Sequence, residues 1–289
     1  MRKNKLKYAQ KNKKLHFTYA KSMKKIFSLF IGFCLVFAVF CVIPRREVAF
    51  AEDNEKLLAI IIDDFGGYER GGVDEMLNLP IPLTCAVIPF VENTRSDAEL
   101  AAKSGKEVIL HMPMESHVNL PLSWYGPVFI GNYDSESVAC GKIDKCLAEI
   151  PEAVGANIHI GSGVSQNKKL MTAIINHFNS KGMFFCDSKT ITNSACEGAA
   201  IECNTPYISR DVFLEPHGEK SYASACKYLL KAGEIALDKG YAIAIGHVGR
   251  EGGADTARAI LDSLPALKMM GIKIVPLSEI AALLRKNVV

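Results

Sequence analysis

The sequence predicts an α/β fold with a mostly parallel sheet, and two observations carry this prediction. From residue 57 onward, short apolar runs alternate with longer amphipathic stretches as far as the C-terminus. The apolar runs contain few polar residues, which is typical of strands buried on both faces of a parallel sheet. The roughly 235 residues from 55 to 289 fit one α/β barrel as well as one open sheet, so we expect a single domain.

Seven expected strands follow one another, each with an expected helix behind it. The strands are apolar runs of at least four residues, and the helices are the amphipathic stretches between them. In chain order the pairs are 57–62 with 71–79, 83–88 with 94–105, 107–110 with 135–150, 156–160 with 167–182, 183–186 with 193–202, 242–245 with 255–271, and 272–277 with 278–286. The irregular stretch 112–134 contains the single tryptophan, Trp124, and is expected to form a wall or lid of a groove.

Residues 1–51 are expected to be a leader that directs export. The segment 26–43 carries no charge, and the Lys and Arg residues before it form a basic flank that stays on the cytoplasmic side. Two alternatives remain open: a secretory signal cleaved after an A-x-A site at Ala49 and Ala51, or an uncleaved anchor, since eighteen apolar residues just suffice to span a bilayer. The domain is expected to contact a membrane only through this segment, if it is uncleaved.

The exported part has a different charge from the whole chain. It holds 22 of the 34 basic residues and 30 of the 31 acidic residues, a net charge of −8, so the overall +3 belongs to the leader. A nucleic-acid partner is therefore disfavoured, because binding to phosphates requires a basic face.

The cysteines point to no thiolate metal site, because no C-x-x-C spacing exists. Two pairs have spacings that could form local disulfides, Cys196 with Cys203 and Cys140 with Cys146.

Side chains that can bind metal or transfer protons recur where the apolar runs end. Taken singly, an acid after a strand is most often a turn former, and a histidine beside apolar residues is most often a core residue. In a parallel α/β fold, however, these strand ends open on one face, so residues distant in sequence converge there. The residues concerned are the pair Asp63 and Asp64, His111, His159, Asp187 and His247.

One carboxylate and two imidazoles are a usual ligand set for a catalytic divalent metal, with positions left for water and substrate. One aspartate of the pair Asp63–Asp64 can bind the cation, and the other can accept a proton from water. The residue pattern alone does not assign these two roles. Zinc is the first expectation for a His/His/Asp set, with cobalt, manganese and iron as alternatives.

Six ordered segments, "IIDDFG", "VILHMPMES", "AVGANIHIGS", "FFCDSKT", "RDVFLE" and "AIAIGHVG", resemble the divergent polysaccharide deacetylase family over about residues 57–284. This resemblance implies an irregular (β/α) barrel, a divalent metal, and removal of N- or O-acetyl groups from an envelope or extracellular polysaccharide. It also implies roles for single residues. Asp63 matches the catalytic base, Asp64, His111 and His159 match the metal ligands, and His247 matches the acid that protonates the leaving group.

The chain departs from related deacetylases at several positions. Glu115 stands where those enzymes have the second histidine of an H-x-x-x-H segment, so it is expected beside the metal or substrate, with His159 as the third ligand. Ile158 and Gly163 replace an asparagine and an arginine of the family pattern. Three further residues match positions that orient His247 or the base, although an internal Arg–Asp pair that holds the fold is an equal interpretation; they are Asp187, Arg210 and Asp211.

Two other functions are kept beside the hydrolase. The altered positions Ile158 and Gly163 are compatible with a non-catalytic glycan-binding domain that retains the metal site. A serine hydrolase that uses Ser162 with His247 and Asp187 is the third alternative, although "GSGVS" lacks the serine-centred G-x-S-x-G turn.

Overall fold

The computed structural model describes residues 55–216 and 219–286. The predicted leader, residues 1–51, lies outside the described residues, as do both alternatives for it. Within the described part, none of the helices is long and apolar enough to cross a membrane.

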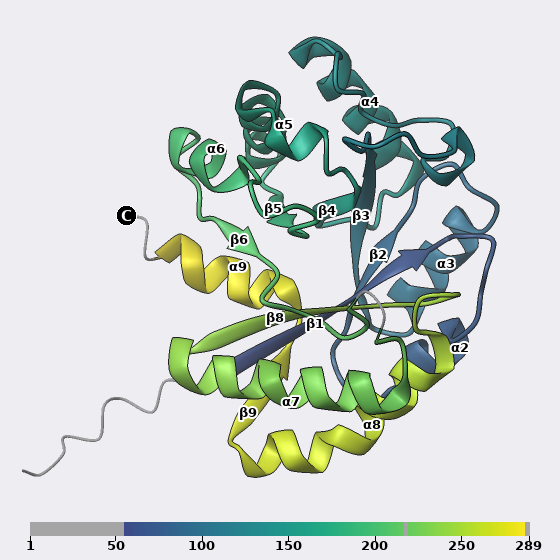
Figure 1. Cartoon of the computed structure of the whole chain (residues 1–289), viewed down its shortest axis with the longest axis vertical. Coiled ribbons are helices and arrows are strands. Elements are labelled where there is room, and N and C mark those ends of the chain that lie inside the picture. Colours follow the sequence, from purple (N-terminus) through teal and green to yellow (C-terminus); the bar gives the residue numbers. More distant parts are fainter. Residues whose placement is uncertain (1–54, 217–218, 287–289) are drawn as a thin grey trace, which may run out of the picture. The chain divides into compact units, whose positions relative to one another are not determined.

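The domain is built around one parallel sheet (Figure 1). The strand order is β6-β5-β4-β3-β2-β1-β8-β7. The remaining strand, β9, pairs with the first half of β1, and β2 pairs with the second half of β1 on the same side. The strands are β1 (Lys56–Phe65), β2 (Thr84–Val87), β3 (Glu107–Met114), β4 (Gly155–Ile160), β5 (Phe184–Asp187), β6 (Ile208–Ser209), β7 (Val212–Phe213), β8 (Tyr241–His247) and β9 (Ile272–Val275).

The sheet curls into an irregular barrel because one short segment pairs on both sides. β6 pairs with β5, β7 pairs with β8, and only Arg210 and Asp211 separate β6 from β7. The Arg210 N–H donates to the carbonyl of Asp187 in β5, and the Asp211 N–H donates to the carbonyl of Ile243 in β8. Residues 208–213 thus span the gap between β5 and β8. The predicted irregular (β/α) barrel is confirmed.

Helices surround the outer face of the curled sheet, except that the last helix of the chain covers one end of the barrel (Figure 1). They are α2 (Val73–Leu77), α3 (Thr94–Lys103), α4 (Glu136–Glu149), α5 (Lys168–Ser180), α6 (Cys196–Glu202), α7 (Tyr222–Lys239), α8 (Gly253–Met269) and α9 (Leu277–Lys286), with 3-10 turns η1 (Leu122–Trp124) and η2 (Val164–Gln166). Several begin at side-chain caps; the Asn167 carbonyl, for example, accepts from the Leu170 N–H at the start of α5.

Strand alternation divides the apolar residues into two cores. Leu58 and Ile60 of β1 point outward and pack with the helices, whereas Ile61 points into the barrel together with Ile245 of β8. Ile280 of α9 belongs to this inner core, so α9 covers the barrel at the end where the strands begin. The interior is consequently filled with apolar side chains below the opposite end, where the polar residues lie.

The seven predicted strands are all present, and β3 extends beyond its predicted end to Met114. The prediction missed β6, β7 and α7. The two strands have only two residues each, and the buried face of α7 is made mostly of small residues, so its apolar periodicity is weak.

The two local disulfides that the spacing allows do not form, because all seven cysteines among the described residues are free. Cys140 and Cys146 lie six residues apart in α4, and Cys196 and Cys203 lie at opposite ends of α6. Six or seven helical residues span roughly 9–10 Å, more than the ~7 Å that a disulfide can bridge between two Cα atoms.

Candidate metal centre

Four polar side chains lie above the inner apolar core, on the strand positions that point into the barrel. Asp63 comes two residues after the inner-core residue Ile61, and His111 two residues after Ile109. Asn157 in β4 and His247 in β8 lie at the same level: His111 pairs in register with Asn157, and Asp63 with His247. The parallel strands therefore bring residues nearly 200 positions apart in the sequence to one end of the barrel.

Asp64 reaches the same site through a backbone irregularity. Regular alternation would point its side chain outward, like Ile62, but the pairing of β1 with β2 shifts register between Ile62 and Phe65. At this bulge Asp64 has a left-handed backbone with φ of 70°, which aspartate tolerates better than most residues. Bulges commonly redirect a side chain next to a functional site, and here both neighbouring aspartates face the barrel end.

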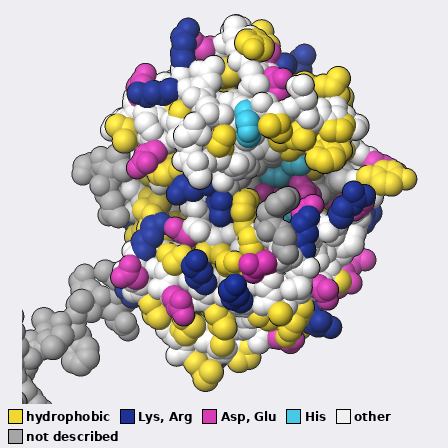
Figure 2. Space-filling model, viewed as in Figure 1, with side chains coloured by type: hydrophobic (Ala, Val, Ile, Leu, Met, Phe, Trp, Pro, Cys, Tyr) yellow, Lys and Arg dark blue, Asp and Glu magenta, His cyan; other side chains and the backbone are white. Residues whose placement is uncertain are grey.

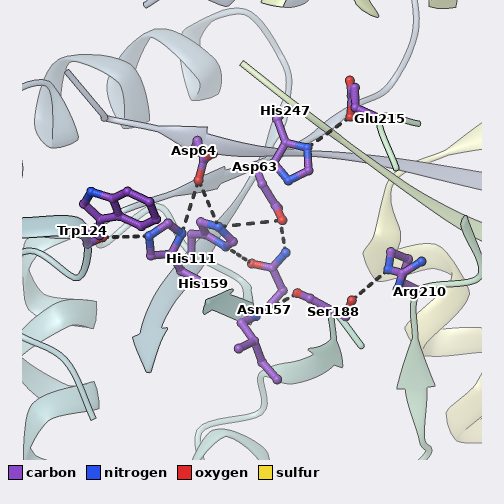
Figure 3. Close-up of polar contacts among 11 residues, drawn as sticks. Asp63, Asp64, His111, Trp124, Asn157, His159, Ser188, Arg210, Glu215 and His247 are labelled. Atoms are coloured by element: carbon purple, nitrogen blue, oxygen red, sulfur yellow. Dashed lines mark hydrogen bonds and ion pairs between the residues drawn. The ribbon is translucent and has the colours of Figure 1, made fainter. Parts of the chain in front are cut away.

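Asp64, His111 and His159 bring one ligand atom each to within 4.8 Å of one another (Figure 3). Asp64 Oδ1 lies 3.4 Å from His111 Nε2 and 3.3 Å from His159 Nδ1. Two ligand atoms at ordinary bond lengths from a tetrahedral zinc ion lie roughly 3.3 Å apart. The two distances from Asp64 Oδ1 therefore suit a shared divalent metal ion, and the three side chains form one possible metal-binding group.

Hydrogen bonds fix which ring nitrogen of each histidine faces Asp64. His111 Nδ1 donates to the Asn157 side-chain carbonyl over 2.7 Å, and His159 Nε2 donates to the backbone carbonyl of Trp124 over 3.0 Å. In each ring the other nitrogen then keeps its lone pair for a cation, which is the arrangement found around metal-binding histidines. The Trp124 carbonyl belongs to the irregular stretch 112–134, so this stretch takes part in the site.

Asn157 also contacts the second aspartate. Its side-chain N–H donates to Asp63 Oδ1 over 2.7 Å, and both residues are buried. The other oxygen, Asp63 Oδ2, lies 3.7 Å from His111 Nε2 and faces the site (Figure 3). One amide thus holds a metal-site histidine and a carboxylate at once.

His247 lies beside Asp63 and is held by a buried glutamate. Its Nδ1 donates to Glu215 Oε2 over 3.1 Å, while the other carboxylate oxygen accepts from the Thr256 hydroxyl. A Cβ at Gly252 would lie 2.2 Å from Glu215 Oε1, so glycine is required there for the carboxylate to fit. Nε2 of His247 is left to face the pocket.

The electrostatics of the site favour positive charge. Burial alone would lower the pKa of His247, but the hydrogen bond with Glu215 and the charges of Asp64, Glu215 and Asp63 raise it to about 9. Burial would likewise lower the pKa of His111, yet the two aspartates raise it above its usual value. For Asp64, burial favours the neutral acid, but the adjacent imidazoles of His111 and His159 and the charge of His247 hold its pKa well below the usual range. A carboxylate is therefore maintained where a cation would bind.

Two adjoining hollows open over these residues, and Figure 2 shows histidine and acidic side chains in a depression of this face. A pocket of about 190 Å³ is lined by both aspartates, His111, His159, His247 and Thr190, among others. It shares Asp64, His159, Ile160 and Glu251 with a groove of about 660 Å³, which Trp124 and Tyr68 also line. The exposed fractions of Trp124 and Tyr68 are 57% and 83%, so both rings are free to contact a ligand. The predicted groove wall is therefore present in the stretch that contains Trp124.

The remaining sequence-predicted residues lie outside the cluster. Glu115 accepts the N–H of Asn132 over 2.6 Å and holds that loop; it is not in the group that could bind a metal. Asp211 accepts from Lys239 and from the Ile243 N–H, two residues into β8, so it does not reach His247. The residue that holds His247 is Glu215, which the sequence does not predict as a partner.

Asp187 and Arg210 do not pair with each other through their side chains either. Asp187 follows the inward-facing Cys186, so strand alternation directs it away from the barrel interior. Its carboxylate accepts from the Lys189 N–H and the Tyr207 hydroxyl, and Arg210 donates to the carbonyls of Ser188 and Lys189. Both side chains thus hold the turn after β5.

The serine hydrolase alternative is wrong. The Ser162 hydroxyl contacts Ser116 and the Nδ1 atom of His117 at 2.9 and 2.8 Å, so its hydrogen bonds do not involve His247 or Asp187. Ser162 connects two loops and is not placed as a nucleophile.

Packing accounts for the two altered positions. The Ile158 side chain is buried in the outer core. A Cβ at Gly163 would lie 2.5 Å from Asn132 Oδ1 and 2.8 Å from the Ser116 carbonyl carbon, so an arginine there would displace the Asn132 loop. Both departures follow from how this chain packs around the site.

Sequence reasoning missed Asn157 and Glu215 as partners of the site. Asn157 has a usable signal, because it lies two residues before His159 in the same predicted strand and so on the same face. Glu215 has no such signal in the sequence, because it follows the two-residue strand β7, which is too short to show strand periodicity.

Comparisons with known proteins agree with this architecture. Residues 60–281 match the family described as divergent polysaccharide deacetylase. The chain is 28% identical over 211 residues to an uncharacterized protein of Haemophilus influenzae (strain ATCC 51907 / DSM 11121 / KW20 / Rd), covering 73% of this chain and 72% of that protein. It is 31% identical over 194 residues to the uncharacterized protein YibQ of Escherichia coli (strain K12), covering 66% of this chain and 58% of YibQ.

A solved structure shows the same fold. The uncharacterized protein ATU2773 from Agrobacterium tumefaciens C58 superposes with a TM-score of 0.70 at 22% sequence identity, covering 78% of this chain and 89% of that one.

Fold and site together define a curled, parallel-stranded α/β barrel with a possible His/His/Asp metal site at the carboxyl ends of its strands. The family match covers over three quarters of the chain. The chain therefore belongs to the divergent polysaccharide deacetylase family.

Proposed function

We propose that the protein is a metal-dependent hydrolase that removes acetyl groups from an envelope or extracellular polysaccharide. The observation that carries the proposal is the cluster of Asp64, His111 and His159, in which Asp64 Oδ1 lies at distances from both imidazoles that suit a tetrahedral ion. Membership of a polysaccharide deacetylase family supports a carbohydrate substrate. A bound divalent metal would act as a Lewis acid that polarises the acetyl carbonyl and lowers the pKa of water. Zinc suits this ligand set best.

Asp63 is the residue we assign as general base. Asn157 occupies its Oδ1, so Oδ2 is the oxygen left to accept the proton of the attacking water. Because the Asn157 amide also holds His111, the base and the metal ligands keep a fixed spacing. Asp64 is assigned as ligand because both imidazoles contact its Oδ1.

His247 is the residue we assign as general acid. Glu215 accepts its Nδ1 proton and favours the charged ring, so Nε2 can donate a proton to the departing nitrogen or oxygen of the sugar. Asp63 and His247 are neighbours across β1 and β8, which allows one to take a proton and the other to give one within a single pocket.

The groove beside the pocket supports a polymer as substrate. It is open and shares residues with the pocket, and Trp124 and Tyr68 offer exposed aromatic faces to sugar rings. Export of the domain is part of the proposal and is supported by the basic flank and the apolar segment 26–43.

The test is a pair of substitutions at the adjacent aspartates. Asp63→Asn should keep the metal but lower acetate release from peptidoglycan, chitin oligomers or acetylated xylan about 10²- to 10⁴-fold, because an amide accepts no proton. Asp64→Asn should lower metal content, with partial recovery when metal is added. Acetate release and elemental analysis measure both effects. If wild-type protein binds metal and glycan but releases no acetate, the domain is a binding module and the proposed hydrolysis is wrong.

A further inference from the structure

The turn after β5, residues 188–190, forms part of the wall of the catalytic pocket. Ser188, which is buried, and Thr190 both line this pocket together with the aspartates and His247. Between them, Lys189 has a left-handed backbone with φ of 48°, a conformation that costs a non-glycine residue free energy. Such a conformation persists only where surrounding contacts hold it.

Five hydrogen bonds hold this turn. Asp187 Oδ1 accepts the Lys189 N–H over 2.8 Å, and Asp187 Oδ2 accepts the Tyr207 hydroxyl over 3.0 Å. Arg210 donates from Nε to the Ser188 carbonyl over 2.8 Å and from a terminal nitrogen to the Lys189 carbonyl over 3.0 Å. The Ser188 hydroxyl accepts the Ile158 N–H of β4 over 3.1 Å. The position of residue 190 is therefore fixed by the surrounding structure.

Thr190 has no hydrogen-bond partner for its side chain. Its hydroxyl oxygen is buried, and no described residue lies within hydrogen-bonding reach of it. An unpaired buried hydroxyl destabilises the folded state, so each such group in a folded protein calls for an explanation. Among the described residues only Ser165 shares this condition, and Ser165 does not line the catalytic pocket.

We infer that Thr190 is a substrate-binding residue, whose hydroxyl turns into the pocket by rotation about χ1 and bonds a hydroxyl or carbonyl oxygen of the acetylated sugar. Rotation between staggered conformers needs no change in the turn, and the hydrogen bonds above keep the backbone in place. A hydroxyl both donates and accepts, so it suits either kind of sugar oxygen. This inference rests on the proposed function, since it takes the sugar bound beside the metal site as the ligand.

Thr190→Val tests the inference, because valine has nearly the same shape and lacks the hydroxyl. In a background of Asp63→Asn, calorimetry with the tetramer of N-acetylglucosamine and with acetylated xylan oligomers should show a Kd raised roughly 3- to 10-fold by Thr190→Val. In the active protein, KM should rise by the same factor with kcat little changed, the pattern expected when binding is lost equally in ground and transition states. Thr190→Ser should restore both constants.

Thermal unfolding separates substrate binding from a structural role. Thr190→Val should raise Tm by at least roughly 2 °C, because it removes an unpaired buried hydroxyl. Ser165→Ala is the matched control, and it should leave Kd, KM and kcat unchanged. A lower Tm in Thr190→Val means that the hydroxyl supports the fold, and an unchanged Kd means that no sugar oxygen meets it; either result overturns the inference.

The same experiment distinguishes the inference from the proposed function. If wild type releases acetate and Thr190→Val has the same Kd, KM and kcat as wild type, the role of Thr190 is refuted and the hydrolase stands. If Thr190→Val binds the glycan more weakly but wild type releases no acetate, the proposed hydrolysis is refuted and the role of Thr190 in binding stands. If neither oligomer binds, the inference falls, and acetate release from peptidoglycan then decides the proposed hydrolase by itself.

Discussion

Replacing Asn157 by alanine should weaken both the fold and the metal site. The side chain is fully buried and makes two short hydrogen bonds, one to His111 Nδ1 and one to Asp63 Oδ1, each 2.7 Å long. Its loss leaves two buried polar partners unpaired at roughly 1–3 kcal/mol each, so the free energy of unfolding should fall by about 2–6 kcal/mol in the absence of metal. The His111 ring also loses the contact that sets its tautomer, which commonly costs about 10- to 100-fold in metal affinity.

Urea unfolding with and without Zn²⁺, together with metal titration against a competing chelator, measures both effects of Asn157→Ala. The matched control is Asn167→Ala, which removes an asparagine that caps α5 and lines neither the pocket nor the groove, and it should cost about 1 kcal/mol with unchanged metal affinity. Wild-type metal affinity in Asn157→Ala would refute the view that this amide orients His111. A loss of stability no larger than that of the control would refute the count of two buried bonds.

Three further predictions follow from individual contacts. Glu215→Gln should lower the pKa of His247 from about 9 towards its usual 6.5, so the alkaline limb of a pH–rate profile should move to lower pH. In wild type, the raised pKa of His247 stabilises the fold fully below pH 6.5, and this stabilisation is lost as pH rises through about 9. Unfolding measured across that range should show a smaller loss in Glu215→Gln. Metal affinity should fall in acid, because the raised pKa of His111 means that protons compete with the metal for this ring. Titrations with Zn²⁺ between pH 5 and 8 measure this, and an affinity that stays constant over that range would mean that neither imidazole binds the metal. Gly163→Ala should lower the free energy of unfolding by roughly 1–3 kcal/mol, because the new Cβ displaces the Asn132 loop. The control Gly141→Ala, in an open position on α4, should raise the free energy of unfolding by about 0.5–1 kcal/mol. Equal Tm values for the two variants would contradict the packing argument.

Most of the barrel could be predicted from the sequence because its strands are long apolar runs with polar residues at their ends. The same alternation predicts that Asp63 shares a face with Ile61, and His111 with Ile109, so the meeting of these residues follows from strand geometry. The closing strands β6 and β7 could not be predicted, since two-residue strands carry no periodicity.

The supporting residues were harder to predict than the ligands. Asp64 enters the site only through a bulge, which strand alternation does not reveal. Asp187 and Arg210 are charged and follow or precede strands, which suggests a role beside His247. In the structure they hold the turn after β5, and Arg210 does so through bonds to backbone carbonyls, which the sequence cannot reveal. Glu215 takes its position from the loop after β7, which only the closed barrel places beside β8.

The apolar floor formed by α9 and the inner core has a consequence for the order of events in the proposed reaction. Ile61, Ile109, Ile245 and Ile280 fill the barrel beneath the polar residues, so the pocket is blind at that end. Acetate released there must leave by the mouth through which the polysaccharide entered. Departure of the small product and movement of the polymer therefore share one passage, and a bound chain that covers the mouth delays the exit of acetate until it shifts along the groove.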